Sequence, residues 1–153
     1  MIQWDEWRGS MDGRPTLWEK HLFCRKGRHV DLHKMVGTDD PGCFHTHPAF
    51  AVRVVCWGGY VEEQEDGSRR RWFPGRIGIV RPADCHRVAR LLNGHVSYSL
   101  WVRFRKSAPI VLRGEGWKRQ AQTYRSPHVL LMMPVRICDS NSRSRSVWRS
   151  ART

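Results

Sequence analysis

The stretch that decides the fold is residues 45–60, which read HTHPAFAVRVVCWGGY. Its centre, residues 50–57, is apolar and rich in β-branched side chains, and it is too short for a typical helix, so it predicts a buried strand. The two glycines that follow predict a bend at its end. At its start, His45 and His47 stand two residues apart, and an extended chain would therefore point both imidazoles to the same face.

Further strands are predicted on both sides of this stretch, each bounded by turn-forming residues. An Asp-Gly turn within residues 65–68 predicts one β-hairpin, and Asn93-Gly94 predicts a second hairpin between the strands that flank it. No helix is predicted from residue 45 to residue 104, so we expect an all-β fold, an antiparallel sandwich or barrel. The predicted strands span residues 16–25, 28–36, 50–57, 60–63, 69–73, 76–81, 86–92 and 95–104.

Composition indicates one basic globular domain. The chain has 153 residues, with 27 Lys and Arg against 14 Asp and Glu, which gives a net charge of +13. This excess favours acidic partners, namely nucleic acid, an acidic protein surface or an anionic small-molecule substrate, although an arginine-rich codon bias would give the same charge without any function. We expect a barrel domain over residues 1–125 and a C-terminal extension over residues 126–153, which ends in a mobile, basic Ser/Arg tail.

The cysteines and the N-terminus bear on the compartment. Five widely spaced cysteines without a C-x-x-C pair argue against a disulfide framework and against a zinc ribbon. The first residues lack the basic and apolar regions of a signal peptide, and no apolar run is long enough to span a membrane. We therefore expect a cytoplasmic protein with no membrane partner, which could form a homodimer through an exposed edge strand.

Three histidines predict a metal site. One ion can contact both His45 and His47, but it needs at least one further ligand, and His86 begins a predicted strand that could run beside the first in a closed barrel. His33 ends a predicted strand shortly before this pair, so it is the candidate for a fourth ligand or for an acid/base group. The remaining histidines are isolated in the sequence and are expected to be ordinary surface or core residues: His21, His29, His95 and His128.

Two other side chains are candidates for contact with a substrate. Arg53 shares the parity of the histidine pair if no bulge intervenes, so its guanidinium could face the interior and bind a carboxylate or phosphate. Tyr98 and Trp101 lie on opposite faces of one predicted strand, so only one of them can face the interior. We take Tyr98 as the second candidate substrate contact.

These residues resemble the two-part signature of the cupin superfamily, G(X)5HXH(X)3-4E(X)6G followed by G(X)5PXG(X)2H(X)3N. His45 and His47 match the HXH pair, while Gly75, Pro82 and His86 match the second motif in residue type. The resemblance covers roughly residues 30–106. It implies a cupin-type β-barrel, that is, a double-stranded jelly roll, around a divalent transition metal ion.

The chain departs from the signature at positions that bear on its chemistry. Neither Ala51 nor Val52 is an acid, although the first motif carries a glutamate ligand there, so the resemblance implies a metal held by histidines alone unless another residue substitutes. In the second motif, Asp84 stands where glycine is usual and Arg90 stands in place of the final asparagine. The turn before His86 must therefore differ from the usual one.

The function that the resemblance implies has two forms. A three-histidine site resembles, more weakly, that of the thiol dioxygenase branch, which implies an Fe(II) oxygenase for a small anionic or thiol substrate, with Zn, Ni or Cu as other possible metals. The alternative is a non-catalytic cupin-fold binding or structural module that engages nucleic acid or an acidic protein through its basic face. A further similarity, to uncharacterised cupin-like proteins of bacteria and their phages, implies no function and is carried by the short patterns HTHP, GGY, RPA, HRV and SLW.

Overall fold

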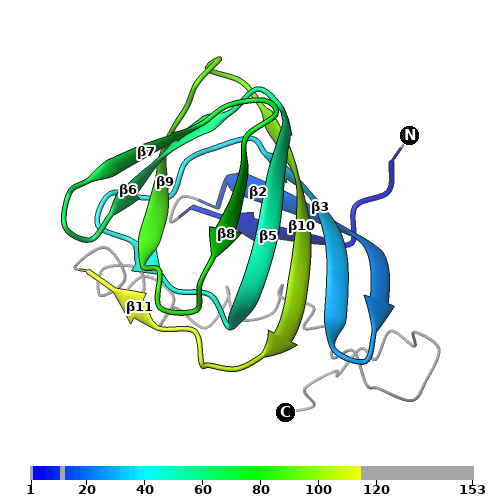
Figure 1. Cartoon of the computed structure of the whole chain (residues 1–153). Helices are drawn as coiled ribbons and strands as arrows, with labels where there is room; N and C mark the ends of the chain where they lie inside the picture. The colour runs from blue at the N-terminus through cyan, green and yellow to red at the C-terminus, as the bar shows by residue number, and fades with distance from the viewer. Residues whose placement is uncertain (1, 11–12, 115–153) are drawn as a thin grey trace, which may run out of the picture.

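The computed structural model describes residues 2–10 and 13–114, and their regular structure consists of strands alone (Figure 1). The fold is all-β and antiparallel, as predicted. The strands are β1 (Glu6–Gly9), β2 (Pro15–Arg25), β3 (Arg28–Met35), β4 (Phe44–His45), β5 (Ala49–Trp57), β6 (Tyr60–Gln64), β7 (Arg69–Trp72), β8 (Ile77–Val80), β9 (His86–Leu91), β10 (Ser97–Lys106) and β11 (Leu112–Arg113).

Two sheets curl around a common interior (Figure 1). One is six-stranded, in the order β1-β2-β3-β10-β5-β8, and the other is five-stranded, in the order β11-β4-β9-β6-β7. From β4 to β11 the chain repeatedly crosses from one sheet to the other, because β5, β8 and β10 lie in the first sheet while β6, β7 and β9 lie in the second. This alternation is the double-stranded jelly roll that the sequence analysis expects.

One of the two predicted hairpins is confirmed and the other is wrong. Strands β6 and β7 pair directly, with Glu63 opposite Arg69. The strands on either side of Asn93-Gly94 do not pair with each other, because β9 bonds to β4 and β6 whereas β10 bonds to β3 and β5. The reversal at Asn93-Gly94 is real, but it carries the chain between the two sheets.

The crossing between β5 and β6 shows why the chain changes sheets there. Gly58 has a φ of 73°, and a Cβ on it would lie 2.1 Å from the Val96 carbonyl oxygen. Ser97 fixes the same place, since its hydroxyl donates to the Trp57 carbonyl at 3.1 Å and accepts from the Gly59 N–H at 3.1 Å. The bend therefore packs directly against the start of β10, and only glycine fits at position 58.

The interior is unusually polar for so small a domain. Its main apolar cluster is formed by Met35, Val55, Tyr60, Trp72 and Leu91. Ionisable side chains are buried beside this cluster, and such groups are rarely buried unless they are paired or have a function. Those with less than a tenth of their surface exposed are Glu19, Asp31, His33, Arg53, Glu62 and His86.

Two expectations about the C-terminal part of the chain concern residues that the structure does not describe. The predicted C-terminal extension and its Ser/Arg tail, residues 126–153, lie outside the described residues, as does the expected domain boundary at residue 125. None of the cysteines within the described ranges forms a disulfide. In the same ranges, no helical segment has the length and apolar character required to cross a membrane.

Candidate metal centre

Strand pairing brings the three predicted histidine ligands together. In the β4–β9 pair, His45 lies directly opposite His86. The next residue, Thr46, is fixed by Val111: the Thr46 N–H donates to the Val111 carbonyl at 3.0 Å, and the Val111 N–H donates to the Thr46 hydroxyl at 2.8 Å. Because this anchor holds the chain extended, His47 turns to the same side as His45.

We call His45, His47 and His86 the histidine trio. Their ring centroids are 5.3, 5.3 and 4.9 Å apart, and one ligand nitrogen from each ring lies within 4.8 Å of the other two. The Nε2 atoms of His47 and His86 are 3.2 Å apart. Ligand atoms bound at about 2.0–2.1 Å to one ion stand about 3.0–3.4 Å apart, so this spacing fits a shared metal ion.

The protonation state of the trio also fits a metal. Burial is the main cause that lowers the pKa of all three imidazoles. The neighbouring rings add to this effect for His47 and His86, while the Asp39 carboxylate opposes it for His45. The rings are therefore neutral at pH 7, which is the form that binds Fe, Zn, Ni or Cu.

The sequence analysis missed an acidic residue beside the trio. The Oε1 atom of Glu62, on β6, lies 3.4 Å from the His86 Nε2 atom, and only 1% of the Glu62 side chain is exposed. This distance also fits two ligands of one ion. Glu62 thus provides near His86 the carboxylate that the cupin signature would place at Ala51 or Val52. The one available signal was that Tyr60, Glu62 and Gln64 share a strand face.

Arg53 faces the interior, as the sequence analysis expected, but its partner is a side chain of this protein. Its Nη2 atom donates to Glu62 Oε2 at 2.6 Å, and its Nη1 atom donates to Glu62 Oε1 and, at 3.1 Å, to the Tyr60 hydroxyl. Its guanidinium carbon lies 3.6 Å from the centre of the Trp72 ring, and the Trp72 indole N–H donates to Glu62 Oε2 at 2.7 Å. Arg53 therefore holds Glu62 in place, and its contact with a substrate carboxylate stays a prediction.

The remaining predicted residues lie around the trio or away from it. Trp101 is buried and faces the interior, with its ring 5.4 Å from that of His47. His33 stacks on the Trp101 ring at 4.8 Å and lies 3.8 Å from Glu19, and its role as ligand or acid/base group stays a prediction. Tyr98 is on the opposite face of β10, 6.0 Å from Lys34 Nζ, so the parity of the strand places Trp101 inward and does not favour Tyr98 as a substrate contact.

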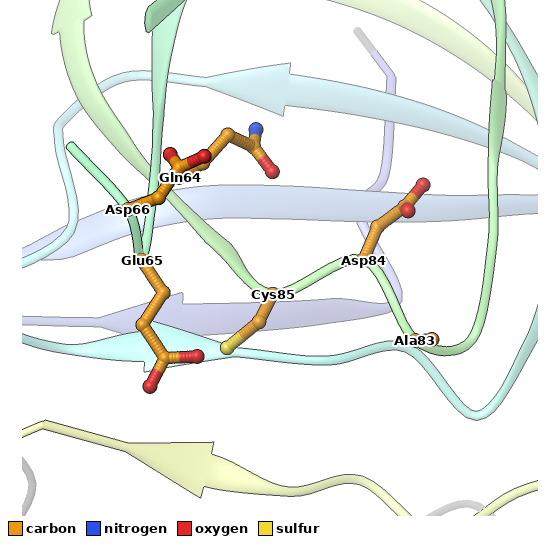
Figure 2. A pocket seen from close by; sticks show the side chains of 6 residues that line it. All are labelled: Gln64, Glu65, Asp66, Ala83, Asp84 and Cys85. Atoms are coloured by element: carbon orange, nitrogen blue, oxygen red, sulfur yellow. The ribbon is translucent and has the colours of Figure 1, made fainter. Parts of the chain in front are cut away.

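An open depression on the surface shares no lining residue with the trio (Figure 2). Glu65 on its rim pairs with Arg113 at 2.9 Å. Burial and then Glu65 raise the pKa of Cys85, so this thiol stays protonated at pH 7 and is not an activated nucleophile. The residues that line the depression are Gln64, Glu65, Asp66, Ala83, Asp84 and Cys85.

Comparison with solved structures adds to two observations: the jelly-roll topology, and the convergence of the HXH histidines with His86. A protein from Ralstonia eutropha JMP134, provisionally assigned as a mannose-6-phosphate isomerase, is 26% identical to this chain, with a TM-score of 0.54. The match covers 61% of this chain and 88% of that one. The chain has the cupin fold.

Other solved structures match this chain at lower sequence identity. The EutQ protein of Clostridium difficile is 10% identical, with a TM-score of 0.55 and coverage of 68% of this chain and 81% of that one. The iron(II) form of HppE is 14% identical, with a TM-score of 0.51 and coverage of 61% and 52%. At these identities the similarity is one of fold alone. No protein-family model matches this sequence, and no curated protein sequence matches it either.

Proposed function

We propose that this cupin binds one divalent transition metal ion at the histidine trio and that it is an Fe(II) oxygenase for a small anionic or thiol substrate. The observation that carries the proposal is the convergence of three neutral imidazoles from β4, the segment after it and β9. Three histidines leave coordination positions open, as catalytic sites do and closed structural sites do not. When bound, the ion would supply Lewis-acid or redox chemistry at those positions.

The protein residues have distinct roles in this proposal. The trio would hold the ion, and Glu62 would either complete the ligand set or accept a hydrogen bond from a group bound there. Arg53 and Trp72 orient the Glu62 carboxylate through three charge-assisted or polar hydrogen bonds, which prevents it from turning away. The net charge of +13 favours the approach of an anionic substrate.

Metal analysis of protein purified without a histidine tag tests the proposal. We expect iron bound to the wild-type chain and to His95→Ala, which changes an exposed histidine outside the trio. We expect its loss in His45→Ala and in His86→Ala. Oxygen uptake in the presence of small thiols, with the same variants, tests the reaction. Unchanged metal content in both trio variants would refute the metal site, while intact metal binding without any oxygen uptake across a panel of thiols and small anions would refute the oxygenase.

A second candidate function is a non-catalytic module that binds nucleic acid, since Arg69, Arg70 and Arg71 are all exposed on β7, an edge strand of the five-stranded sheet. Binding through phosphate contacts must weaken steeply as salt rises. A mobility-shift assay across a salt series, with the triple alanine variant of these arginines as the control, separates this function from the first. Affinity that is insensitive to both salt and the substitutions would exclude it.

A further inference from the structure

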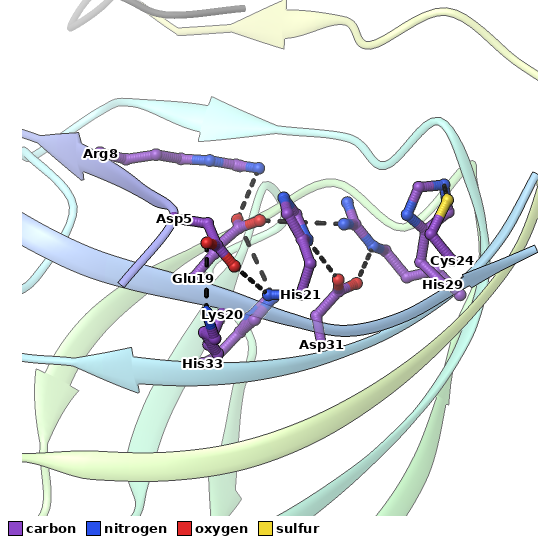
Figure 3. Close-up of polar contacts among 10 residues, drawn as sticks. Asp5, Arg8, Glu19, Lys20, His21, Cys24, His29, Asp31 and His33 are labelled. Atoms are coloured by element: carbon purple, nitrogen blue, oxygen red, sulfur yellow. Dashed lines mark hydrogen bonds and ion pairs between the residues drawn. The ribbon is translucent and has the colours of Figure 1, made fainter. Parts of the chain in front are cut away.

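A second group of metal-binding side chains lies on the β2–β3 hairpin and shares no residue with the trio. His21, His29 and Asp31 each place a ligand atom within 4.8 Å of the other two. His21 is paired with Asp31 across the two strands, and His29 is two residues before Asp31 on β3, so all three side chains share one face (Figure 3). Asp31 is fully buried, whereas His21 is 19% exposed on its side chain, so the group is open on one side.

An irregularity in the pairing of β2 with β3 places a cysteine beside this group. The β2–β3 pairing shifts register between His21 and Phe23, and beyond that irregularity Cys24 is paired with His29. The Cys24 sulfur lies 3.8 Å from His29 Nε2 (Figure 3). A register shift in a strand pair re-aims the side chains around it, and here it places Cys24 opposite His29.

Hydrogen bonds and ion pairs within this group satisfy the Asp31 carboxylate, but they leave one ring nitrogen of His29 without a hydrogen-bond partner among the described residues. Arg103 Nε donates to Asp31 Oδ2 at 2.5 Å, and His21 Nδ1 lies 2.7 Å from Asp31 Oδ1. Together these two hydrogen bonds, which outweigh the effect of burial, keep the pKa of Asp31 below its usual value. In contrast, His29 Nδ1 is buried and has no hydrogen-bond partner among the described residues. Such an atom needs an explanation, and a bound cation is one.

We propose that His21, His29 and Asp31 bind a second divalent metal ion of the zinc class. The proton shared between His21 Nδ1 and Asp31 Oδ1 occupies the position that the ion would take. Two ligands of one zinc ion stand about 3.0–3.4 Å apart, so the present 2.7 Å contact need open by only a few tenths of an ångström. Arg103 would keep its hydrogen bond to the other carboxylate oxygen and fix the orientation of Asp31, which is how ligating carboxylates are commonly held.

The donor set selects the kind of ion. Two imidazole nitrogens disfavour Mg²⁺ and Ca²⁺, which take oxygen ligands, and favour Zn²⁺, Ni²⁺ or Cu²⁺. The exposed Cys24 thiol beside His29 offers a soft ligand within reach of the fourth position. Burial and then the Arg103 charge lower the pKa of His29, so its ring is neutral at pH 7, as a ligand must be.

The test measures how many equivalents of zinc the full chain binds, once its original metal has been removed with a chelator. We expect two equivalents for the wild type and for His95→Gln. We expect one equivalent for the double variant His21→Gln/His29→Gln, and one for His45→Gln/His86→Gln. Because the two double variants remove different ions, failure of the trio proposal and failure of this one give different results: a wild type that binds one ion, lost only in His21→Gln/His29→Gln, would support the hairpin site and refute the trio.

Two further measurements keep the test decisive if the hairpin double variant folds poorly. His29→Gln alone should fold, since His29 Nδ1 makes no hydrogen bond to any described residue, and it should also lose one equivalent. In the His45→Gln/His86→Gln chain, zinc should shift the imidazole nitrogen resonances of His21 and His29 by NMR. The proposal is overturned if the hairpin variants bind as many ions as the wild type with the same affinity, or if zinc leaves these resonances unchanged.

Discussion

His33 should make the stability of this protein depend on pH between about 6.5 and 4. The imidazole is 6% exposed, and burial, only partly opposed by the Glu19 charge, lowers its pKa from 6.5 to about 4 in the folded state. The unfolded chain therefore binds the proton more tightly than the folded chain. The stability contributed by neutral His33 is complete above pH 6.5 and is lost as the pH falls through this range. A difference of about 2.5 pKa units corresponds to about 3 kcal/mol.

Urea unfolding followed by far-UV circular dichroism, at pH values from 7.5 to 4 with chelator present, measures this effect. Other ionisable groups also contribute to the pH dependence of stability, but their contribution remains in a variant that lacks only the His33 imidazole. His33→Gln is that variant, and His95→Gln, at an exposed position, is its control. We expect the wild type to lose about 3 kcal/mol more than His33→Gln between the two ends of the range. Parallel pH profiles for the two chains would refute the reasoning.

Three other outcomes follow from the same geometry. Arg53→Ala should cost about 3–5 kcal/mol in urea unfolding because it leaves the Glu62 carboxylate buried without its partner, and a loss below about 1 kcal/mol would show that the pair is solvated. Gly58→Ala should destabilise the fold more than Gly67→Ala. Both glycines have positive φ, but only the new Cβ at position 58 meets backbone, 2.1 Å from the Val96 oxygen. Equal losses of unfolding free energy in the two variants would contradict that contact. Zinc binding to the trio at pH 7 should release almost no protons, because its imidazoles are already neutral, and calorimetry in two buffers of different ionisation enthalpy checks this.

Local sequence was sufficient for eight of the eleven strands in the described residues and for the convergence of the trio, but it did not predict the short strands β1, β4 and β11. The β-branched run before Gly58 predicts β5, and the alternation after Asn93-Gly94 predicts β10, because side chains that fit a pleated, half-buried surface are a local property. The HXH spacing places two imidazoles on one face of an extended chain for the same reason. His86 could be added because a turn sets it at the start of a strand, and β9 does begin there.

Contacts between strands far apart in the sequence were decided by the tertiary structure. Turn chemistry at Asn93-Gly94 predicts a reversal of the chain, but the partner strand depends on which sheet buries each face, and here β9 and β10 go to different sheets. Glu62 looks like a surface residue in the charged segment 60–64. It is buried in the interior only because Arg53, from the opposite sheet, supplies a positive charge that offsets the free-energy cost of burying the carboxylate.

The same division between what the sequence predicts and what the tertiary structure decides holds for the two groups of metal-binding side chains. The sequence by itself predicted an all-β chain in which His45 and His47 point to the same side, since residues two apart on an extended segment share a face. It left His21 and His29 as unrelated histidines, eight positions apart. His29 shares a strand face with Asp31, but only the hairpin register brings His21 opposite that carboxylate, because the distance between side chains on neighbouring strands is set by pairing and not by position along the chain.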